Sequence, residues 1–309
     1  MSTTVANWSV DRLADLTGKT YFITGGNSGI GYESALHLRR ANADVIIGAR
    51  SPDKGAAAVA SLTATPGAGS VDMVRLDLAD TASIGNADKA LRNLTDGVDA
   101  MVNNAGVMQT PQQQTADGFE MQFGTNHLGH YLLNYLVFDL VVARRGRIVP
   151  VSSIAHRSAK GINFDDPMLT NSYSPTAAYN QSKLANILYG LELARRLEAA
   201  GSSVIAATAH PGYSATNLQS SGPTGLWKQL YRLTNAVMAQ SAADGAVPIV
   251  LAAAGTEARN GAYYGPTKYG DARGPVGDST IAAVALDEGA ASRLWSLSEE
   301  LLGITFTVA

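Results

Sequence analysis

The sequence has no cysteine and little that suggests a polyanionic partner. None of its 309 residues is cysteine, which excludes disulfides, thiolate zinc sites and thiol nucleophiles. The formal net charge of −3 and the lack of a basic run argue against binding to nucleic acid. No pattern of metal ligands stands out either, so no metal site is expected.

Signals for export and membrane insertion are also missing. Residues 1–8 lack the basic start and the apolar run of a signal peptide. The most apolar predicted helix, residues 131–143, contains Asn134 and Asp139 and is too short to span a bilayer. We therefore expect a soluble, cytoplasmic protein without a membrane span.

The composition and pattern that are present fit one large α/β domain over residues 1–309. Hydrophobic residues make up 46% of the chain, which is enough to bury a large core. Apolar runs alternate with helical patterns, which predicts a doubly wound parallel sheet of about seven strands flanked by helices. The predicted strands are residues 20–23, 44–48, 71–76, 98–102, 147–151, 203–209 and 261–265, and a Gly/Pro-rich loop follows to residue 278.

A glycine-rich turn follows the first predicted strand. Thr24-Gly-Gly-Asn-Ser-Gly-Ile-Gly31 lies between that strand and a helical pattern over residues 32–41. Glycines let the backbone approach a pyrophosphate closely, and a helix N-terminus supplies NH groups and the positive end of a dipole. This context favours dinucleotide binding over the alternative, a simple tight turn.

The end of the second strand indicates which dinucleotide is bound. Proteins that bind NAD typically carry Asp or Glu about 20 residues after the glycines, where it grips the ribose 2′-hydroxyl. Here Arg50 occupies that place, and no carboxylate appears before Asp53. Because a guanidinium suits a 2′-phosphate, we expect NADP(H) to be preferred over NAD(H). The alternative is a surface arginine at the start of a helix.

Small and polar residues follow three later strands. They are Asp77, Asn103-Asn-Ala-Gly106 and Ser152-Ser153. Ligands of open parallel sheets bind outside the carboxyl ends of the strands, so these residues should lie against the cofactor. Asp77 could accept a hydrogen bond from an adenine amino group, or it could cap the next helix, a role for which Asp80 competes.

Two residues interrupt the patterns in which they lie. Asn126 falls within an apolar helix predicted over residues 119–143, where it makes a structural hydrogen bond, bends the helix or lines a site. Pro150 lies inside the fifth strand, where it cannot donate to a ladder. A small bulge or an unpaired position is expected there.

Tyr179 and Lys183 are four residues apart in a helical stretch, so they project from the same face one turn apart. A phenol with a pKa of about 10 is a poor acid or base at neutral pH, but a neighbouring ammonium lowers that pKa. The pair could then move a proton. Taken alone, the spacing also fits a surface pair on an amphipathic helix.

The whole set of motifs, in this order, resembles the classical short-chain dehydrogenases/reductases, over about residues 16–265. The set comprises Thr24-Gly-x-x-x-Gly-Ile-Gly31, Asn103-Asn-Ala-Gly106, Asn126, Ser153, Tyr179-x-x-x-Lys183 and Pro211-Gly212. More narrowly, Asn126-His-Leu-Gly-His-Tyr-Leu-Leu, Val151-Ser-Ser-Ile-Ala-His156 and Ser182-Lys-Leu-Ala-Asn186 are similar to the retinol dehydrogenase branch and its bacterial relatives. The resemblance implies a single-domain Rossmann fold and, in this branch, mostly NADP(H).

The resemblance also implies catalytic roles. Tyr179 would give a proton to the carbonyl oxygen in reduction and take it from the alcohol in oxidation. Lys183 would lower the pKa of Tyr179 and hold the nicotinamide ribose. Ser153, rather than Ser152, would hydrogen-bond the substrate oxygen. Asn126 would hold a water in a proton relay to Lys183.

The cofactor site follows from the same resemblance. Its residues would be Gly25, Asn27, Ser28, Gly29, Ile30, Gly31, Arg50, Asp77, Leu78, Asn104, Ala105, Gly106, Tyr179, Lys183, Pro211, Gly212, Ser214 and Thr216.

Two segments should shape the substrate site. Residues 154–174 form an insertion that should border the active site, as in the retinol dehydrogenase branch. Residues 213–240 occupy the family's substrate-loop position, with few charges near Leu218, Leu226, Trp227, Leu230 and Tyr231. This favours a bulky apolar ketone or aldehyde, whereas the alternative is an ordinary amphipathic helix on the sheet.

We therefore expect an NADP(H)-dependent oxidoreductase that interconverts an alcohol and a ketone or aldehyde. One alternative is a catalytically silent NADP-binding sensor or interaction protein. Another is an epimerase or dehydratase with the same Tyr/Lys pair, although such enzymes have a different glycine spacing. Residues 126–143 and 177–199 are more apolar than one sheet face requires, which with the resemblance predicts a homodimer or homotetramer.

Overall fold

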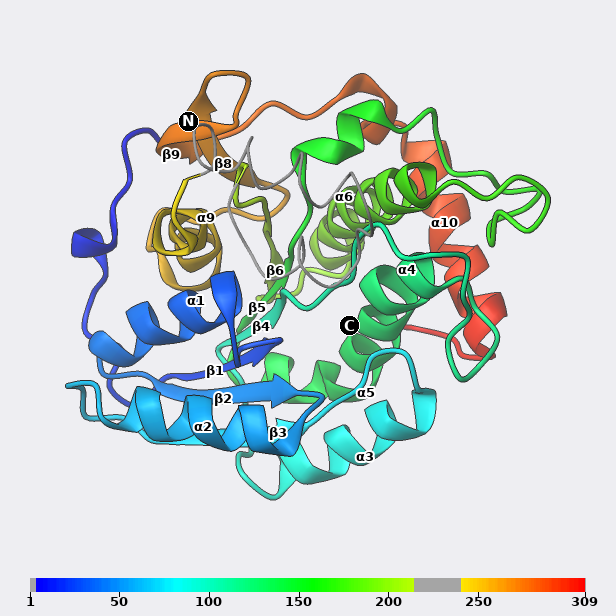
Figure 1. Cartoon of the computed structure of the whole chain (residues 1–309). Helices are drawn as coiled ribbons and strands as arrows, with labels where there is room; N and C mark the ends of the chain where they lie inside the picture. Colours follow the sequence, from blue (N-terminus) through cyan, green and yellow to red (C-terminus); the bar gives the residue numbers. More distant parts are fainter. Residues whose placement is uncertain (1–3, 214–239, 309) are drawn as a thin grey trace.

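A parallel sheet runs through the middle of the molecule with helices on both faces (Figure 1). The computed structural model describes residues 4–213 and 240–308. Its strands are β1 (Thr20–Thr24), β2 (Asp44–Ala49), β3 (Val71–Arg75), β4 (Ala100–Asn103), β5 (Arg147–Pro150), β6 (Ile205–Ala206), β7 (Thr208–Ala209), β8 (Tyr263–Lys268) and β9 (Arg273–Asp278).

The longer helices are α1 (Gly29–Arg40), α2 (Pro52–Thr63), α3 (Thr81–Arg92), α5 (Gly129–Ala143), α6 (Pro175–Ala199), α9 (Ala242–Ala254) and α10 (Glu288–Leu302). Short helical turns are η1 (Val10–Arg12), α4 (Met121–Phe123), η2 (Gly124–Leu128), η3 (Ile154–Ser158) and η4 (Ala283–Ala285). The expected substrate loop at 213–240, with Leu218, Leu226, Trp227, Leu230 and Tyr231, lies outside the described residues except for its two ends.

The strand order explains where a ligand can bind. Six strands run parallel in the order β3-β2-β1-β4-β5-β6. The chain winds outward from β1 in one direction to β3 and then returns to build the other half from β4. The crevice for a ligand forms between the two halves, at the carboxyl ends of β1 and β4. The doubly wound α/β fold expected from the sequence is confirmed.

Alternation along the strands buries both faces of the sheet. In β1, Tyr21 and Ile23 pack with residues of α1, α2 and α9, whereas Phe22 packs with residues of α3 and α5 on the opposite face. A parallel sheet covered by helices on both faces needs such continuous apolar strands. This is why short runs of Val, Ile and Phe could be recognised as strands in the sequence.

Pro150 divides the sixth strand. Ala207 donates its N–H to the oxygen of Ile148, and Ser152 donates to the oxygen of Ala209. The donor between these two positions would be the N–H of residue 150, which proline lacks. Pairing is therefore interrupted opposite Ala207, and the strand expected over 203–209 appears as β6 and β7. The unpaired position predicted at Pro150 is confirmed.

A second small sheet extends the parallel arrangement. β8 pairs in parallel with β7, and β9 pairs antiparallel with β8. The expected Gly/Pro-rich loop after residue 265 was therefore wrong, because residues 263–278 form a hairpin with a register shift between Pro266 and Lys268. Proline is tolerated at such an irregular edge, where a missing N–H disturbs no central ladder.

The helix predicted over 119–143 is not α-helical along its whole length. It begins at Met121 and contains the π-helical turn η2, in which Gly129 donates to the oxygen of Gly124. Asn126 lies in this turn. Such insertions bend a helix and redirect the side chains that they carry. The π-helical turn thus lies at the residue for which a structural hydrogen bond, a bend or a place in a site was expected.

The C-terminal segment covers the apolar side of α5 and α6. Phe306 makes ring contacts with Tyr131, Tyr135 and Phe138 of α5 and with Trp295 of α10. Part of the apolar surface that suggested a homodimer or homotetramer is therefore buried within the chain itself. Within the described ranges, no helix is long and apolar enough to cross a membrane.

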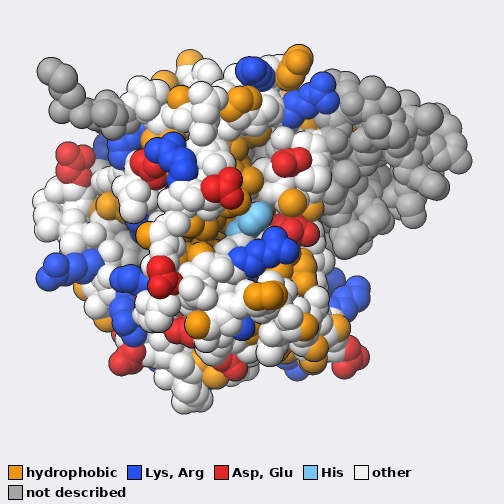
Figure 2. All heavy atoms as spheres, turned by 90° about the vertical axis from the view of Figure 1, so that its left-hand side faces the viewer, with side chains coloured by type: hydrophobic (Ala, Val, Ile, Leu, Met, Phe, Trp, Pro, Cys, Tyr) orange, Lys and Arg blue, Asp and Glu red, His pale blue; other side chains and the backbone are white. Residues whose placement is uncertain are grey.

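One face of the molecule can be examined for a gathered patch of charge. On the face shown in Figure 2, basic and acidic side chains are interspersed over the described atoms. A nucleic-acid surface requires basic side chains gathered into a patch or stripe.

Candidate active site

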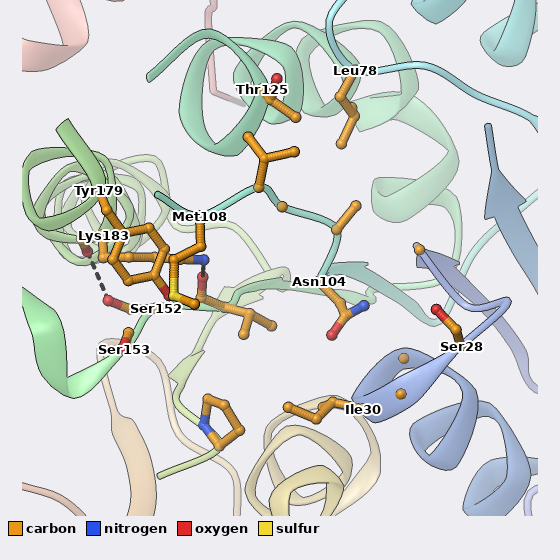
Figure 3. A pocket seen from close by; sticks show the side chains of 18 of the residues that line it. Ser28, Ile30, Leu78, Asn104, Met108, Thr125, Ser152, Ser153, Tyr179 and Lys183 are labelled. Atoms are coloured by element: carbon orange, nitrogen blue, oxygen red, sulfur yellow. Dashed lines mark hydrogen bonds between the residues drawn. The ribbon is translucent and has the colours of Figure 1, made fainter. Parts of the chain in front are cut away.

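A cavity of about 730 Å³ opens at the carboxyl ends of the parallel strands. Figure 3 shows Tyr179, Lys183 and Ser153 toward one end of it and Asn104, Ser28 and Ile30 toward the other. The expected residues that line it are Gly25, Asn27, Ser28, Gly29, Ile30, Gly31, Arg50, Asp77, Leu78, Asn104, Ala105, Gly106, Ser153, Tyr179, Lys183, Pro211 and Gly212. Ser214 and Thr216 lie outside the described residues.

The glycine turn needs its glycines for both conformation and space. Gly25 and Gly29 have positive φ angles of 67° and 55°. A Cβ on Gly31 would lie 2.4 Å from Asn104 Nδ2 and 2.5 Å from the oxygen of Gly25. Helix α1 starts at this turn with no acidic residue in its first turn, so its positive dipole end suits the phosphates of a dinucleotide.

Thr24 joins the glycine turn to the end of β4. Its hydroxyl accepts the N–H of Ala105 at 2.9 Å, and its backbone oxygen accepts Asn104 Nδ2 at 2.8 Å. Its hydroxyl also lies 2.8 Å from Nε2 of His130. Since Nδ1 of His130 faces the backbone oxygen of Asn126 at 3.0 Å, that nitrogen carries the proton. Burial lowers the pKa of His130 to about 4, which keeps it neutral.

Asn126 uses its side chain to hold the loop after β4. Its Oδ1 accepts the N–H of Val107 at 2.8 Å, and its Nδ2 donates to the oxygen of Val107 and to Ser182 Oγ at 2.9 Å each. A Cβ on Gly106 would lie 2.9 Å from Asn126 Oδ1 and 3.7 Å from Lys183 Nζ. Asn126 therefore fixes the wall beside Lys183, and its side chain does not line the cavity.

Helix α6 carries the Tyr179 and Lys183 pair. Ser174 caps the helix by accepting the N–H of Ala177, and Pro175 occupies its first turn. Lys183 Nζ donates to the backbone oxygen of Val151 at 3.1 Å and lies 5.9 Å from the centre of the Tyr179 ring. Burial lowers the pKa of Lys183 to about 8. The pair therefore lies in the cavity wall and is not a surface pair.

The two serines after β5 have different environments. Ser152 is buried, and its hydroxyl donates to the backbone oxygen of Lys183 at 2.7 Å. Ser153 is partly exposed and caps η3, where its Oγ accepts the N–H of Ala155 at 3.2 Å. The Ser153 hydroxyl therefore keeps its own proton to donate into the cavity.

The opposite end of the cavity is basic. Arg50 and Ser51 line it after β2, together with Lys54 from the first turn of α2. Sequence reasoning missed Lys54, although a lysine one turn into a helix that starts beside Arg50 was a usable signal. Asp77 also lines the cavity, and Asp80 caps α3 by accepting the N–H groups of Ala82 and Ser83. Asp77 is therefore not the cap of that helix.

A second missed residue is Gln122, which is fully buried in α4. Its Oε1 accepts the N–H of Gln109 at 2.9 Å, and its Nε2 donates to the Tyr173 hydroxyl at 3.2 Å and to the oxygen of Pro175 at 2.9 Å. It thus joins the loop after β4 to the end of the 154–174 insertion. Ile154, Ala155 and Ser158, at the start of that insertion, line the cavity.

Comparison with protein families gives a match over most of the chain. The family model described as short chain dehydrogenase matches residues 19–225. Retinol dehydrogenase 14 of Homo sapiens is 36% identical over 304 residues, covering 93% of this chain and 87% of that protein. The short-chain dehydrogenase/reductase drtF of Aspergillus calidoustus is 35% identical over 310 residues, covering 94% of this chain and 95% of that protein.

Solved structures agree with the fold. A crystal structure of an uncharacterised protein from Mycobacterium paratuberculosis superposes with a TM-score of 0.80 at 37% identity, covering 98% of this chain and 100% of the other. A short chain dehydrogenase from Burkholderia cenocepacia in complex with NADP has a TM-score of 0.63 at 24% identity, covering 81% and 96%. The chain belongs to the short-chain dehydrogenase/reductase family of oxidoreductases, in its retinol dehydrogenase-like branch.

Proposed function

We propose that the protein is an NADP(H)-dependent oxidoreductase that interconverts a bulky apolar alcohol and its ketone or aldehyde. One observation carries the proposal. Tyr179, Lys183 and Ser153 line the same cavity as the glycine turn at the start of α1. A nicotinamide dinucleotide with its phosphates at that turn would extend along the cavity toward the three side chains.

The catalytic end can assist hydride transfer with a proton. Below its pKa of about 8, the Lys183 ammonium favours the ionised form of the Tyr179 phenol beside it. The protonated phenol gives its proton to the carbonyl oxygen in reduction, and the phenolate takes a proton from the alcohol in oxidation. Ser153 donates a hydrogen bond to the substrate oxygen as negative charge develops there. Bound NADP(H) would supply or take the hydride.

Asn126 would support this chemistry from behind the wall. Its hold on Val107 keeps the loop after β4 beside Lys183. We propose that the water of a proton relay to Lys183 lies next to this turn.

The basic end of the cavity supports NADP(H) over NAD(H). The cations of Arg50 and Lys54 line the end at which α2 begins. Asp53, the carboxylate closest in sequence to Arg50, does not line the cavity. A guanidinium and an ammonium stabilise a 2′-phosphate, which a carboxylate at this place would repel.

The catalytic end of the cavity supports a neutral, apolar substrate. Around Tyr179 the described lining includes Met108, Ile154, Ala155 and Tyr213, and Lys183 contributes the one charge there. A cationic substrate would find no counter-ion in the described lining, and an anionic one could pair only with Lys183, whose ammonium already donates to the backbone oxygen of Val151. The similarity to relatives named retinol dehydrogenases agrees with an apolar alcohol or carbonyl.

A turnover assay separates this function from its alternatives. NADPH oxidation is followed at 340 nm with neutral ketones and aldehydes of increasing apolar size, each beside a carboxylated analogue. Turnover of the neutral series is expected. A silent NADP-binding sensor would bind NADPH without oxidising it, and an epimerase would convert its substrate without net consumption of cofactor.

Location and assembly stay predictions. We propose a cytoplasmic protein, which fractionation of the native cells tests. A homodimer or homotetramer would need surface of α5 and α6 that α10 and Phe306 leave uncovered. A monomer by light scattering at micromolar concentration would refute it.

A further inference from the structure

The hairpin between β8 and β9 lies behind two different parts of the active-site wall. Its turn and the residues after β9 contact the Pro211–Gly212 turn on one side and the η3 turn after Ser153 on the other. Pro211, Gly212 and Ser153 all line the cavity. Asp271, in the hairpin turn, is where the contacts from both sides meet.

Two chains of hydrogen bonds, here called arms, meet at Asp271. The first runs from Gly212 through the buried His210 to Asp271. The N–H of Gly212 donates to His210 Nδ1 at 3.1 Å, so the ring proton of His210 is on Nε2. That nitrogen donates to Ser279 Oγ at 2.8 Å, and the Ser279 hydroxyl donates to Asp271 Oδ2 at 2.9 Å. Every donor in this arm points toward the carboxylate. The arm therefore holds the Gly212 turn in one orientation.

The other arm runs from Asp271 to the turn that carries Ser153. The Arg157 guanidinium forms an ion pair with Asp271 and donates to the oxygens of Gly270 at 2.9 Å and Thr280 at 3.0 Å. Arg157 lies in η3, the turn capped by Ser153. Next to it, His156 Nδ1 donates to the oxygen of Ser153 at 2.7 Å. The arm thus ties the η3 turn to the hairpin.

Close packing leaves the His210 arm little freedom. A Cβ on Gly265 would lie 1.9 Å from His210 Nε2, and a Cβ on Gly212 would lie 2.4 Å from the oxygen of Ala272. His210 also stacks on Tyr263 with ring centres 5.0 Å apart. Because the backbone at Gly265 and Gly212 approaches His210 and Ala272 this closely, a displacement of Asp271 would be transmitted to the cavity wall.

We propose that Asp271 is a positioning residue that sets the distance between Ser153 and the Pro211–Gly212 turn, through Arg157 on one side and Ser279 and His210 on the other. The inference rests on the proposed function for its catalytic readout. Ser153 must meet the substrate oxygen while Gly212 borders the cofactor, so an error of a fraction of an ångström between them slows the reaction.

Single-arm variants test the proposal because each arm reaches a different part of the wall. Ser279→Ala cuts the arm to Gly212, so the Kd for NADP⁺ should rise by about 10-fold while kcat falls by about twofold at most. Arg157→Met cuts the arm to Ser153, so kcat should fall by about 10-fold or more with a nearly unchanged Kd. Asp271→Asn should show both effects.

The matched control is Asp278→Asn. Asp278 lies in β9 of the same hairpin, pairs with Arg259 and accepts the N–H of Val5 at 2.7 Å, but does not line the cavity. Thermal unfolding of every variant is measured beside Kd and kcat. Asp278→Asn should lose about as much thermal stability as Asp271→Asn. Its Kd and kcat should stay within about twofold of wild type.

The proposal is overturned if the two single-arm variants change Kd and kcat in equal proportion, or if Asp271→Asn matches Asp278→Asn in both. Should Asp271→Asn not fold, the split between Ser279→Ala and Arg157→Met decides the question. The proposed function can fail separately. Wild type that binds NADP⁺ but turns over no carbonyl would refute that function, while the Kd of Ser279→Ala would still test the arm to Gly212.

Discussion

The Lys183 ammonium lies 5.9 Å from the centre of the Tyr179 ring while donating a hydrogen bond to the backbone oxygen of Val151. The contact with Val151 places the ammonium at the end of β5, where Ser152 and Ser153 follow. Helix α6 and the sheet thus fix the relative position of the catalytic groups. Burial has a cost, since it lowers the pKa of Lys183 from 10.5 to about 8.

That shift predicts how stability depends on pH in the protein without cofactor. Between about pH 8 and 10.5 the unfolded chain holds the Lys183 proton and the folded chain does not. The contribution of Lys183 to the free energy of unfolding is therefore most unfavourable below pH 8 and improves as the pH rises through this window. In urea unfolding, the free energy of unfolding should rise less for Lys183→Met than for wild type between pH 7.5 and 9.5. If the free energy of unfolding depended on pH equally in both proteins, the result would contradict the burial of a titrating lysine.

The buried histidines predict a loss of stability at acidic pH. Burial lowers the pKa of His127 and His210 to about 3 and that of His130 to about 4, from 6.5. Below pH 6.5 these histidines are therefore protonated in the unfolded chain but not in the folded chain. Each one should lower the free energy of unfolding by roughly 2 kcal/mol at pH 5. The melting temperature of wild type should fall between pH 7 and pH 5. His130→Asn should fall less steeply, and an identical fall would argue against a neutral, buried His130.

Arg50 should decide cofactor preference. Removing one guanidinium from a phosphate site forfeits a charge-assisted hydrogen bond, so Arg50→Ser should raise the Kd for NADPH by roughly 10- to 100-fold and leave that for NADH unchanged. Arg75→Ser is the matched control, since Arg75 is exposed at the end of the adjacent strand β3 and does not line the cavity. Fluorescence titration measures all four constants. Equal losses for NADPH and NADH would show that Arg50 does not contact the 2′-phosphate.

Phe306 should contribute strongly to stability although it lies near the C-terminus. It is buried among rings of α5 and α10, so Phe306→Ala should lower the free energy of unfolding by about 3–5 kcal/mol. Leu286→Ala serves as the control because that side chain is 57% exposed, and its effect should stay within about 0.5 kcal/mol. Chemical unfolding compares the two. A small loss for Phe306→Ala would mean that the C-terminal segment does not pack on α5 in solution.

Most of the fold and of the candidate site was predicted from local patterns in the sequence. The glycine turn, the Tyr179 and Lys183 spacing and the apolar strands depend on neighbours within a few residues, so each was readable in the chain. Pro150 signalled an unpaired position for the same reason. Its consequence, the break at Ala207, depends on a strand more than 50 residues away and could not be read locally.

Lys54 was missed despite a local signal, but two other missed features depend on distant contacts. Gln122 acts through Gln109, Tyr173 and Pro175, and the hairpin of β8 and β9 pairs two segments rich in Gly and Pro. Neither has a periodic pattern. The expected assembly rested on apolar helices whose cover, α10 and Phe306, comes from the far end of the sequence.

The central claim is that Tyr179 moves the proton, and Tyr179→Phe tests it most directly. We would measure NADPH oxidation at 340 nm with the best neutral ketone, together with the Kd for NADPH. Removing one hydroxyl should lower kcat by about 10²- to 10⁴-fold, because the acid–base group is lost, and leave cofactor binding nearly unchanged. Turnover that survives in the variant would contradict the assignment of Tyr179 as the acid–base residue.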